Sequence, residues 1–425
     1  MSYSKTVLPN GLRVILAPQK DSVAATILVL VEAGSKYETK EINGLSHFLE
    51  HMCFKGTTRR PKAIDIAGEL DGLGADYNAF TSQEYTGYYV KVQFEKAGQA
   101  LDIISDLYLN PVFEPAEIEK EKGVVIEEIN MYEDLPPRKV ADVFTDLLYG
   151  DQPAGWDIAG KKEIIQKLKK EDFLKYRTEH YVAKATLIVV AGAFDEKEFR
   201  EGIQNHFKGI TVAKKFGKVK TIESQLKPDV KIQYKKSDQT HFVLGSRAFD
   251  LYDSRKYALD VLGDILGGGM SSRLFQKIRE ELGAAYYVRA DSNLSTDHGY
   301  FAVASGVDHK KFDLVVGAIL EELKRVANEN VPDAELQRSK DHLAGKLLLG
   351  LETSDSLASF YGIQGILNEE IQNPDDLLKK ITSVTADEIR AVAKDIFVDS
   401  KLNLAVIGPY EEKNKPDILN ILTFK

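Results

Sequence analysis

Two histidines and a glutamate lie within five positions of one another near the start of the chain. Residues 47–51 read His-Phe-Leu-Glu-His, so His47 and His51 are four positions apart and Glu50 directly precedes the second histidine. On an α-helix, positions four apart lie on one face, one turn from each other. Two imidazoles so placed can bind one zinc ion, and Glu50 can accept a proton from water on that ion without being a ligand. The spacing therefore predicts a catalytic metal site on a helix.

The residues around this motif favour a helix. Apolar residues recur at helical spacing over residues 45–54, and Gly56 is a typical stop signal. Cys53 would point about 160° away from His51 on such a helix. We therefore expect Cys53 to pack as a small apolar residue rather than to bind the metal.

A catalytic zinc ion needs a third protein ligand and an open position, so we searched for an acidic residue on another helix. Glu121 and Glu128 are seven positions apart and share a helical face with apolar neighbours. A carboxylate that points inward needs a partner, and a metal ion is one. Glu128 is then the third ligand, Glu121 orients a ligand or the water, and Glu127 fits less well because it lies about 100° round the helix. A charged surface helix stays the alternative, which periodicity alone does not exclude.

Two segments of the chain resemble each other in pattern. Residues 171–192 align without a gap with residues 387–408, and each reads as a helix, a short turn and an apolar strand that ends in Gly. The strand-like runs 23–31 and 240–246 extend the similarity loosely toward the start of each half. We therefore predict two homologous α/β halves that arose by internal duplication.

The proposed halves differ in chemistry. The N-terminal catalytic half covers residues 1–210, a polar, Lys-rich linker covers 211–228, and the second half covers 229–425. Residues 251–279, which include the region matching the metal-site helix, contain neither His nor Glu. One half is thus expected to hold the metal and the other to contribute substrate contacts.

Composition narrows the classes of protein. The 425 residues are 43% hydrophobic, which is ample for a core, and the net charge is −9 with no long run of Lys or Arg. Nucleic acid is therefore not an expected partner. No signal-peptide pattern and no apolar stretch long enough for a bilayer is visible near the start, and a single cysteine excludes an internal disulfide. We expect a cytoplasmic protein without a membrane partner.

These motifs resemble the pitrilysin family of zinc metallopeptidases, also called inverzincins. The resemblance rests on the H-x-x-E-H segment GLSHFLEHMCFKGT and on EKGVVIEEINMYED, where the family's E-x6-E pattern falls on Glu121 and Glu128. The branch with mitochondrial processing peptidase and its bacterial relatives is the most similar, over essentially the whole chain. The resemblance implies one zinc ion per chain. It also implies an α+β fold in which each half is a mostly antiparallel sheet covered by helices, and the halves form a clam-like chamber.

Two further segments match the family. By resemblance, Asn78, Ala79 and Phe80 form an edge strand that pairs with an extended peptide through its backbone. Without the resemblance, an ordinary strand with aromatic packing is the plainer interpretation. Arg279 and Tyr286, seven positions apart, match the pair that contacts the substrate carbonyl in relatives, where they can stabilise an oxyanion. Tyr287 is an adjacent competitor, but the spacing favours Tyr286.

The resemblance implies a zinc-dependent endopeptidase that cleaves peptides or flexible protein segments, with Glu50 as general base and with a homodimer as the expected assembly. A non-catalytic structural or regulatory subunit is the alternative, because some relatives have lost the metal. The retained His47, Glu50, His51 and Glu128 argue against that alternative. The same ligands also accept manganese or cobalt, so the sequence does not fix the metal.

Overall fold

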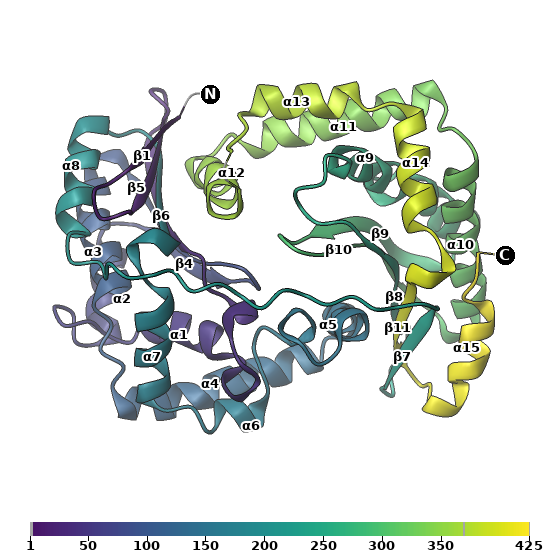
Figure 1. Ribbon diagram of the computed structural model, residues 1–425, viewed down its shortest axis with the longest axis horizontal. Coiled ribbons are helices and arrows are strands. Elements are labelled where there is room, and N and C mark those ends of the chain that lie inside the picture. Colours follow the sequence, from purple (N-terminus) through teal and green to yellow (C-terminus); the bar gives the residue numbers. More distant parts are fainter. Residues whose placement is uncertain (1–2, 369, 425) are drawn as a thin grey trace. The chain divides into compact units, whose positions relative to one another are not determined.

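The computed structural model describes residues 3–368 and 370–424, and its internal contacts divide the chain into two units (Figure 1). Each unit consists of most of one half of the chain together with a short segment of the other half. Unit 1 comprises Met1–Ile129, Asp157–Val219 and Leu347–Pro374, and unit 2 comprises Asn130–Trp156, Lys220–Lys346 and Asp375–Lys425.

Unit 1 is built on a six-stranded mixed sheet. Its central strands are near-continuous runs of apolar residues, as expected where both faces of a sheet are covered. One neighbouring pair, β2 and β6, is parallel, and the other pairs are antiparallel. In spatial order the strands are β1 (Ser4–Val7), β2 (Arg13–Pro18), β6 (Thr186–Gly192), β3 (Ala24–Val31), β5 (Thr86–Gln93) and β4 (Asp76–Thr81).

Helices cover both faces of this sheet, and the side chains of successive β3 residues point to opposite faces. Ile27 and Val29 face the larger core, whereas Leu28 and Leu30 face the smaller one. The larger core lies under α1 (Leu45–Cys53), α3 (Ala97–Leu109), α4 (Pro115–Glu133), α7 (Lys170–His180) and α8 (Glu196–His206), with α2 (Ala63–Gly72) at its margin, and the smaller lies under α12 (Ser354–Leu367).

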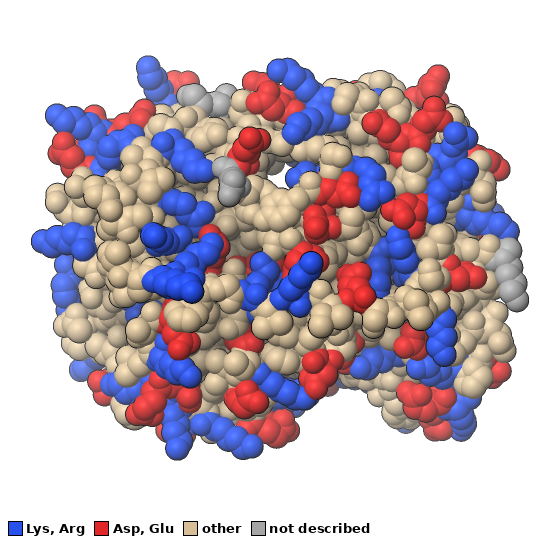
Figure 2. Space-filling model, in the orientation of Figure 1, with Lys and Arg blue, Asp and Glu red and all other residues tan. Residues whose placement is uncertain are grey.

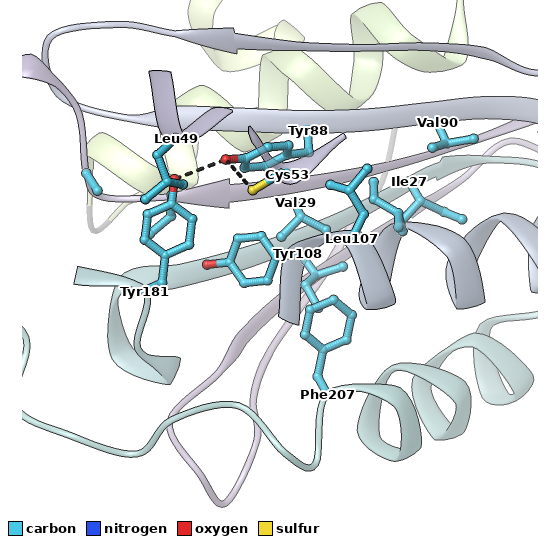
Figure 3. Packing of buried hydrophobic residues seen from close by; sticks show 14 of the residues in the cluster. Ile27, Val29, Leu49, Cys53, Tyr88, Val90, Leu107, Tyr108, Tyr181 and Phe207 are labelled. Carbon is cyan, nitrogen blue, oxygen red and sulfur yellow. Dashed lines mark hydrogen bonds between the residues drawn. The ribbon is translucent and has the colours of Figure 1, made fainter. Parts of the chain in front are cut away.

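A small polar cluster lies inside the larger core of unit 1 (Figure 3). The hydroxyls of Tyr88 and Tyr181 are 3.0 Å apart, and the Cys53 thiol donates to Tyr88 at 3.6 Å. Burial raises the pKa of the Cys53 thiol to about 11, so it stays protonated. Cys53 is therefore a packing residue, as the sequence predicted.

Unit 2 is built on a five-stranded mixed sheet. The parallel pair is β7 and β11, and the other neighbours are antiparallel. In spatial order the strands are β7 (Asp229–Tyr234), β11 (Leu402–Gly408), β8 (Thr240–Ala248), β10 (Gly299–Val307) and β9 (Ala285–Leu294). The helices of its larger core are α9 (Lys256–Gly267), α10 (Phe312–Asn328), α11 (Asp333–Gly350), α13 (Pro374–Ser383), α14 (Ala386–Ile396) and α15 (Lys415–Ile421).

Each sheet receives one helix from the other half of the chain. In unit 2, α5 (Pro136–Tyr149) packs Val140 and Phe144 against strands β8 and β11. In unit 1, α12 packs against β3 and β6. Gly362 allows this close approach, because a Cβ there would lie 2.8 Å from a methyl carbon of Leu30. Both helices follow a long helix, α4 or α11, so the exchange is reciprocal.

The strand registers show that the two sheets are equivalent. Five strands of unit 1 correspond in order and direction to the five strands of unit 2. Strands β6 and β11 are the two apolar strands of the sequence repeat, and α7 and α14 are its two helices. The predicted duplicated α+β fold, with sheets covered by helices, is thereby confirmed.

The chain between the two sheets, residues 211–227, carries no helix or strand. Across the described part of the chain, none of the helices is both long and apolar enough to span a membrane. On the face drawn in Figure 2, acidic and basic side chains are interspersed.

Candidate metal centre

Helix α1 is held at its start by a buried carboxylate from the preceding loop. Glu38 accepts hydrogen bonds from the backbone N–H groups of Gly44 at 2.8 Å and Ser46 at 2.6 Å, and from the Asn43 side chain at 3.1 Å. The first N–H groups of a helix have no partner within the helix, so this carboxylate takes the role of an N-cap. Burial raises the pKa of Glu38 to about 7. Gly44 has φ of 97°, a conformation that favours glycine.

The apolar face of α1 fixes the orientation of its functional face. Phe48 and Leu49 are fully buried, and the Phe48 ring packs edge-on against Phe173 of α7 with ring centroids 5.0 Å apart. The side chains of His47 and His51 keep 13% and 21% exposure, so both remain accessible. The helix therefore presents its two imidazoles together, as the four-residue spacing predicted.

The acidic residues of α4 meet this face. Glu128 Oε2 lies 3.5 Å from the Nε2 atom of His47 and 3.5 Å from that of His51. One ligand atom from each of these three residues lies within 4.8 Å of the others. Glu127 is exposed on α4 and does not belong to this group.

These distances fit a zinc ion. Two ligand atoms about 2.1 Å from one ion, at a tetrahedral angle, lie about 3.4 Å from each other. Both nitrogen–oxygen distances to Glu128 are close to that value. Two imidazoles and one carboxylate are also a donor set of catalytic zinc sites, which leave a fourth position for water or substrate.

Glu50 lies on α1 between the two histidines in sequence and is only 9% exposed. The hydroxyl of Thr81, the last residue of β4, donates to Glu50 Oε2 at 2.5 Å. Burial raises the pKa of Glu50, and the Thr81 hydrogen bond offsets part of that effect. A carboxylate with a raised pKa is suited to accept and return a proton near neutral pH.

Glu121 lies behind the histidines rather than beside Glu128. Its Oε1 atom is 3.0 Å from His51 Nδ1, and its Oε2 atom is 2.6 Å from Lys55 Nζ. Burial alone would raise the pKa of Glu121, but the hydrogen bonds from His51 and Lys55 lower it. A carboxylate at Nδ1 keeps the proton on that nitrogen and leaves Nε2 available to a metal.

The other predicted residues lie on the edge strands β4 and β9, except Arg279, which lies on the short helix Phe275–Glu281 before β9. Asn78, Ala79 and Phe80 belong to β4, which has a neighbour on one side only. In unit 2, Arg279 Nη1 donates to the Tyr286 carbonyl at 2.9 Å, and its guanidinium carbon lies 5.0 Å from the Tyr286 ring centroid. The Tyr286 side chain is 78% exposed.

Tyr287 differs from its neighbour. Its hydroxyl lies 3.1 Å from His241 Nδ1, and burial raises its pKa to about 12. Tyr287 thus contacts His241 within unit 2, whereas Tyr286 is the exposed one of the two tyrosines.

Thr81, Lys55 and Glu38 also contact residues of this centre or its helix, although their roles were not predicted from the sequence. A signal existed for Thr81. Alternate residues of a strand share a face, so Thr81 at the end of the Asn-Ala-Phe-Thr segment points away from the Phe80 side, toward α1. No local pattern marks Glu38, because it acts through the fold of its loop.

The fold and the site together define a protein in which one half carries a candidate metal site and the second half has the same fold. Two family models match the chain: Insulinase (Peptidase family M16) over residues 13–162, and Peptidase M16 inactive domain over residues 167–343. The chain belongs to peptidase family M16. The predicted membership of the pitrilysin family is thereby confirmed.

Curated relatives carry the same description across several bacteria. The uncharacterized zinc protease YmxG of Bacillus subtilis is 35% identical over 94% of this chain and 97% of its own length. An uncharacterized zinc protease of Streptomyces coelicolor is 33% identical over 96% of this chain and 90% of its own length. Among solved structures, a protease from Helicobacter pylori has a TM-score of 0.89 at 21% identity and covers 96% of this chain and 99% of its own, which supports the fold.

Proposed function

We propose that this protein is a zinc-dependent endopeptidase that hydrolyses peptides or flexible protein segments. This proposal rests on the ligand atoms of His47, His51 and Glu128, which lie within 4.8 Å of one another. Glu50 lies on α1, the helix that carries both histidines. Its membership of family M16, and relatives described as zinc proteases, support it. One zinc ion per chain is the expected cofactor.

The residues divide the work. A zinc ion held by His47, His51 and Glu128 would lower the pKa of a coordinated water to about 7 and polarise the scissile carbonyl. Glu50 takes a proton from the water whose oxygen attacks the carbonyl carbon. It then delivers that proton to the nitrogen as the C–N bond breaks, which leaves a carboxylic acid and an amine. Transfer of the remaining carboxyl proton to the amine gives the carboxylate and the ammonium. Glu121 holds the His51 ring in place throughout.

Substrate contacts are proposed for the edge strand β4 and for the Arg279–Tyr286 pair of unit 2. The open side of β4 offers backbone N–H and C=O groups at Asn78, Ala79 and Phe80, which can align an extended peptide without selecting its side chains. Arg279 and Tyr286 are proposed to stabilise the oxyanion, because a guanidinium and a phenol are suitable donors. Enclosure of the substrate between two halves, a homodimeric assembly and a cytoplasmic location stay predictions.

The decisive test compares Glu50→Gln with the wild-type protein and with Asp260→Asn, a matched change on α9 of unit 2. We expect Glu50→Gln to retain zinc and to lose hydrolysis of a mixed peptide pool by at least about 100-fold, since it removes the general base. Asp260→Asn should retain both. Full turnover by Glu50→Gln would refute the role of Glu50.

A non-catalytic subunit is the second candidate, favoured if the metal is absent. Metal analysis of the purified protein, beside peptide hydrolysis, distinguishes the two. Near-stoichiometric zinc together with hydrolysis supports the peptidase. The absence of both zinc and hydrolysis supports the non-catalytic subunit.

A further inference from the structure

We propose that Thr81 is a positioning residue that holds the general base Glu50 in its working orientation, an inference that rests on the proposed function. Thr81 ends the edge strand β4, and Glu50 lies on α1. Their hydrogen bond therefore connects the strand that is proposed to bind substrate with the helix that carries His47 and His51. The position of the base is thereby tied to the position of the peptide.

The geometry suits this role. The Thr81 hydroxyl engages only Oε2 of Glu50, at a distance typical of a hydroxyl donating to a carboxylate. Among the described residues no hydrogen bond reaches Oε1, which leaves that oxygen for water. A free glutamate side chain samples several rotamers, and a base must lie within hydrogen-bond reach of its proton. One fixed oxygen restricts the other to a narrow set of positions.

Unit 2 contains the equivalent contact without a metal group. Ser292 of β9 donates to Asp260 of α9 at 3.1 Å. Strand pairing shows that Ser292 corresponds to Thr81. Across the sheet of unit 1, Thr81 pairs with Thr86, Thr86 with Val31, and Val31 with Thr186. Across the sheet of unit 2, Ser292 pairs with Phe301, Phe301 with Ser246, and Ser246 with Leu402. Thr186 and Leu402 are the matching first residues of the repeated strands β6 and β11.

Because the two contacts are equivalent, the Ser292–Asp260 hydrogen bond serves as the control for a contact whose role is only structural. A hydroxyl from the edge strand to an acid on the neighbouring helix ties the two elements together in both units. The two contacts differ in their surroundings, because Glu50 adjoins the histidine pair, whereas the residues at the same spacings from Asp260 are Tyr257 and Val261. If Thr81 only tied strand to helix, its loss would resemble the loss of Ser292.

The experiment compares zinc-loaded wild-type protein with Thr81→Val, Thr81→Ser and Ser292→Ala. Valine keeps the β-branched shape that suits a strand but removes the hydroxyl, and serine keeps the hydroxyl. We expect Thr81→Val to lower kcat by about 10- to 100-fold with KM changed by less than about twofold, because the base is displaced while peptide binding persists. Thr81→Ser should restore most of kcat, and Ser292→Ala should leave kcat and KM unchanged.

Zinc affinity and the urea unfolding midpoint are measured on the same samples, and both should stay close to wild type in Thr81→Val. Unchanged kcat in Thr81→Val, or an equal loss in Thr81→Ser, would overturn the positioning role while leaving the peptidase intact. Loss of zinc from Thr81→Val would reassign Thr81 to support of the metal ligands. A wild-type protein that binds zinc but hydrolyses no peptide would overturn the proposed function, and this inference with it.

Discussion

The helix pairs α1/α4 of unit 1 and α9/α11 of unit 2 occupy equivalent places on equivalent sheets, yet only the first pair brings together the candidate metal ligands among the described residues. In unit 1 the two helices are bridged by His51 and Glu121 at 3.0 Å. In unit 2 they are bridged by Asp264 and His342 at 2.7 Å, with the acid now on the first helix. The framework therefore keeps a polar bridge in both units, and the bridge alone does not make a metal site.

The ligand positions explain the difference. If Asp260 corresponds to Glu50, the counterparts of His47 and His51 are Tyr257 and Val261. The second helices, α4 and α11, have the same order and spacing of buried residues: Ile118, Glu121 and Lys122 in α4, and Leu336, Ser339 and Lys340 in α11. With the same sequence offset, Lys346 corresponds to Glu128. A tyrosine, a valine and a lysine thus stand where two imidazoles and a carboxylate converge, and a lysine would repel a cation.

The largest effect expected from this comparison is at Glu128. Glu128→Ala removes one of the three proposed ligands, so zinc content should fall from about one ion per chain to near none, and hydrolysis should fall by at least about 1,000-fold. Metal analysis and peptide hydrolysis measure both. Removal of zinc from the wild-type protein with a chelator should give the same loss, and added zinc should restore activity only in the wild type.

The controls for that variant are Glu127→Ala, the neighbour on α4, and Lys346→Ala, the counterpart on α11. Both should retain zinc and activity. A full zinc complement in Glu128→Ala would show that the third ligand lies elsewhere.

The exchanged helices α5 and α12 provide the next comparison. Helix α5 comes from the N-terminal half but is buried in unit 2, and α12 comes from the C-terminal half but is buried in unit 1. Phe144 of α5 and Tyr361 of α12 are 1% and 0% exposed. Replacing either with alanine leaves a large cavity and should destabilise the protein by about 3–5 kcal/mol. Urea unfolding measures the loss, and hydrogen exchange locates it: Phe144→Ala should raise exchange in β8 and β11, and Tyr361→Ala in β3 and β6.

The partly exposed Ile363 of α12 provides the control, since Ile363→Ala should cost much less than Tyr361→Ala. Exchange that rises in β8 and β11 instead of β3 and β6 for Tyr361→Ala would contradict the assignment of α12 to unit 1.

The sequence predicted the parts of this molecule that local spacing determines. The i, i+4 histidines, the acidic residues seven apart on α4 and the repeated helix–strand segments each follow from a single periodicity, and the structure contains all three. The same helical face led to the prediction that Glu121 orients a ligand or the water; Glu121 lies 3.0 Å from His51 Nδ1, and its role stays a prediction.

The exchange of α5 and α12 did not follow from the sequence. An amphipathic helix shows that it needs an apolar partner, but its pattern does not say which of two similar sheets provides one. Thr81 and Glu38 were missed for a related reason. Each acts on α1 from a separate segment of the chain. Strand alternation places Thr81 on the side away from Phe80, but the partner that Thr81 meets there, like the partners of Glu38, is set only by the folded backbone.

The smallest effect in this series concerns the acids that precede α1 and α9. Glu38 is buried, and its pKa rises from the ordinary 4.5 to about 7, whereas hydrogen bonds from Arg255 lower the pKa of Asp253. An acid with a raised folded pKa stabilises the fold fully below its unfolded pKa, and that contribution is lost as pH rises through about 7. An acid with a lowered pKa contributes fully above its unfolded value and loses the contribution only in acid.

Between pH 5 and pH 8 the two residues should therefore behave differently. The stability difference between wild type and Glu38→Gln should shrink by up to about 3 kcal/mol as pH rises, because only the wild-type carboxyl must ionise in a buried site. The difference for Asp253→Asn should stay constant over that range. Urea unfolding at several pH values measures both, and a constant difference for Glu38→Gln would mean that the helix start keeps Glu38 ionised despite its burial.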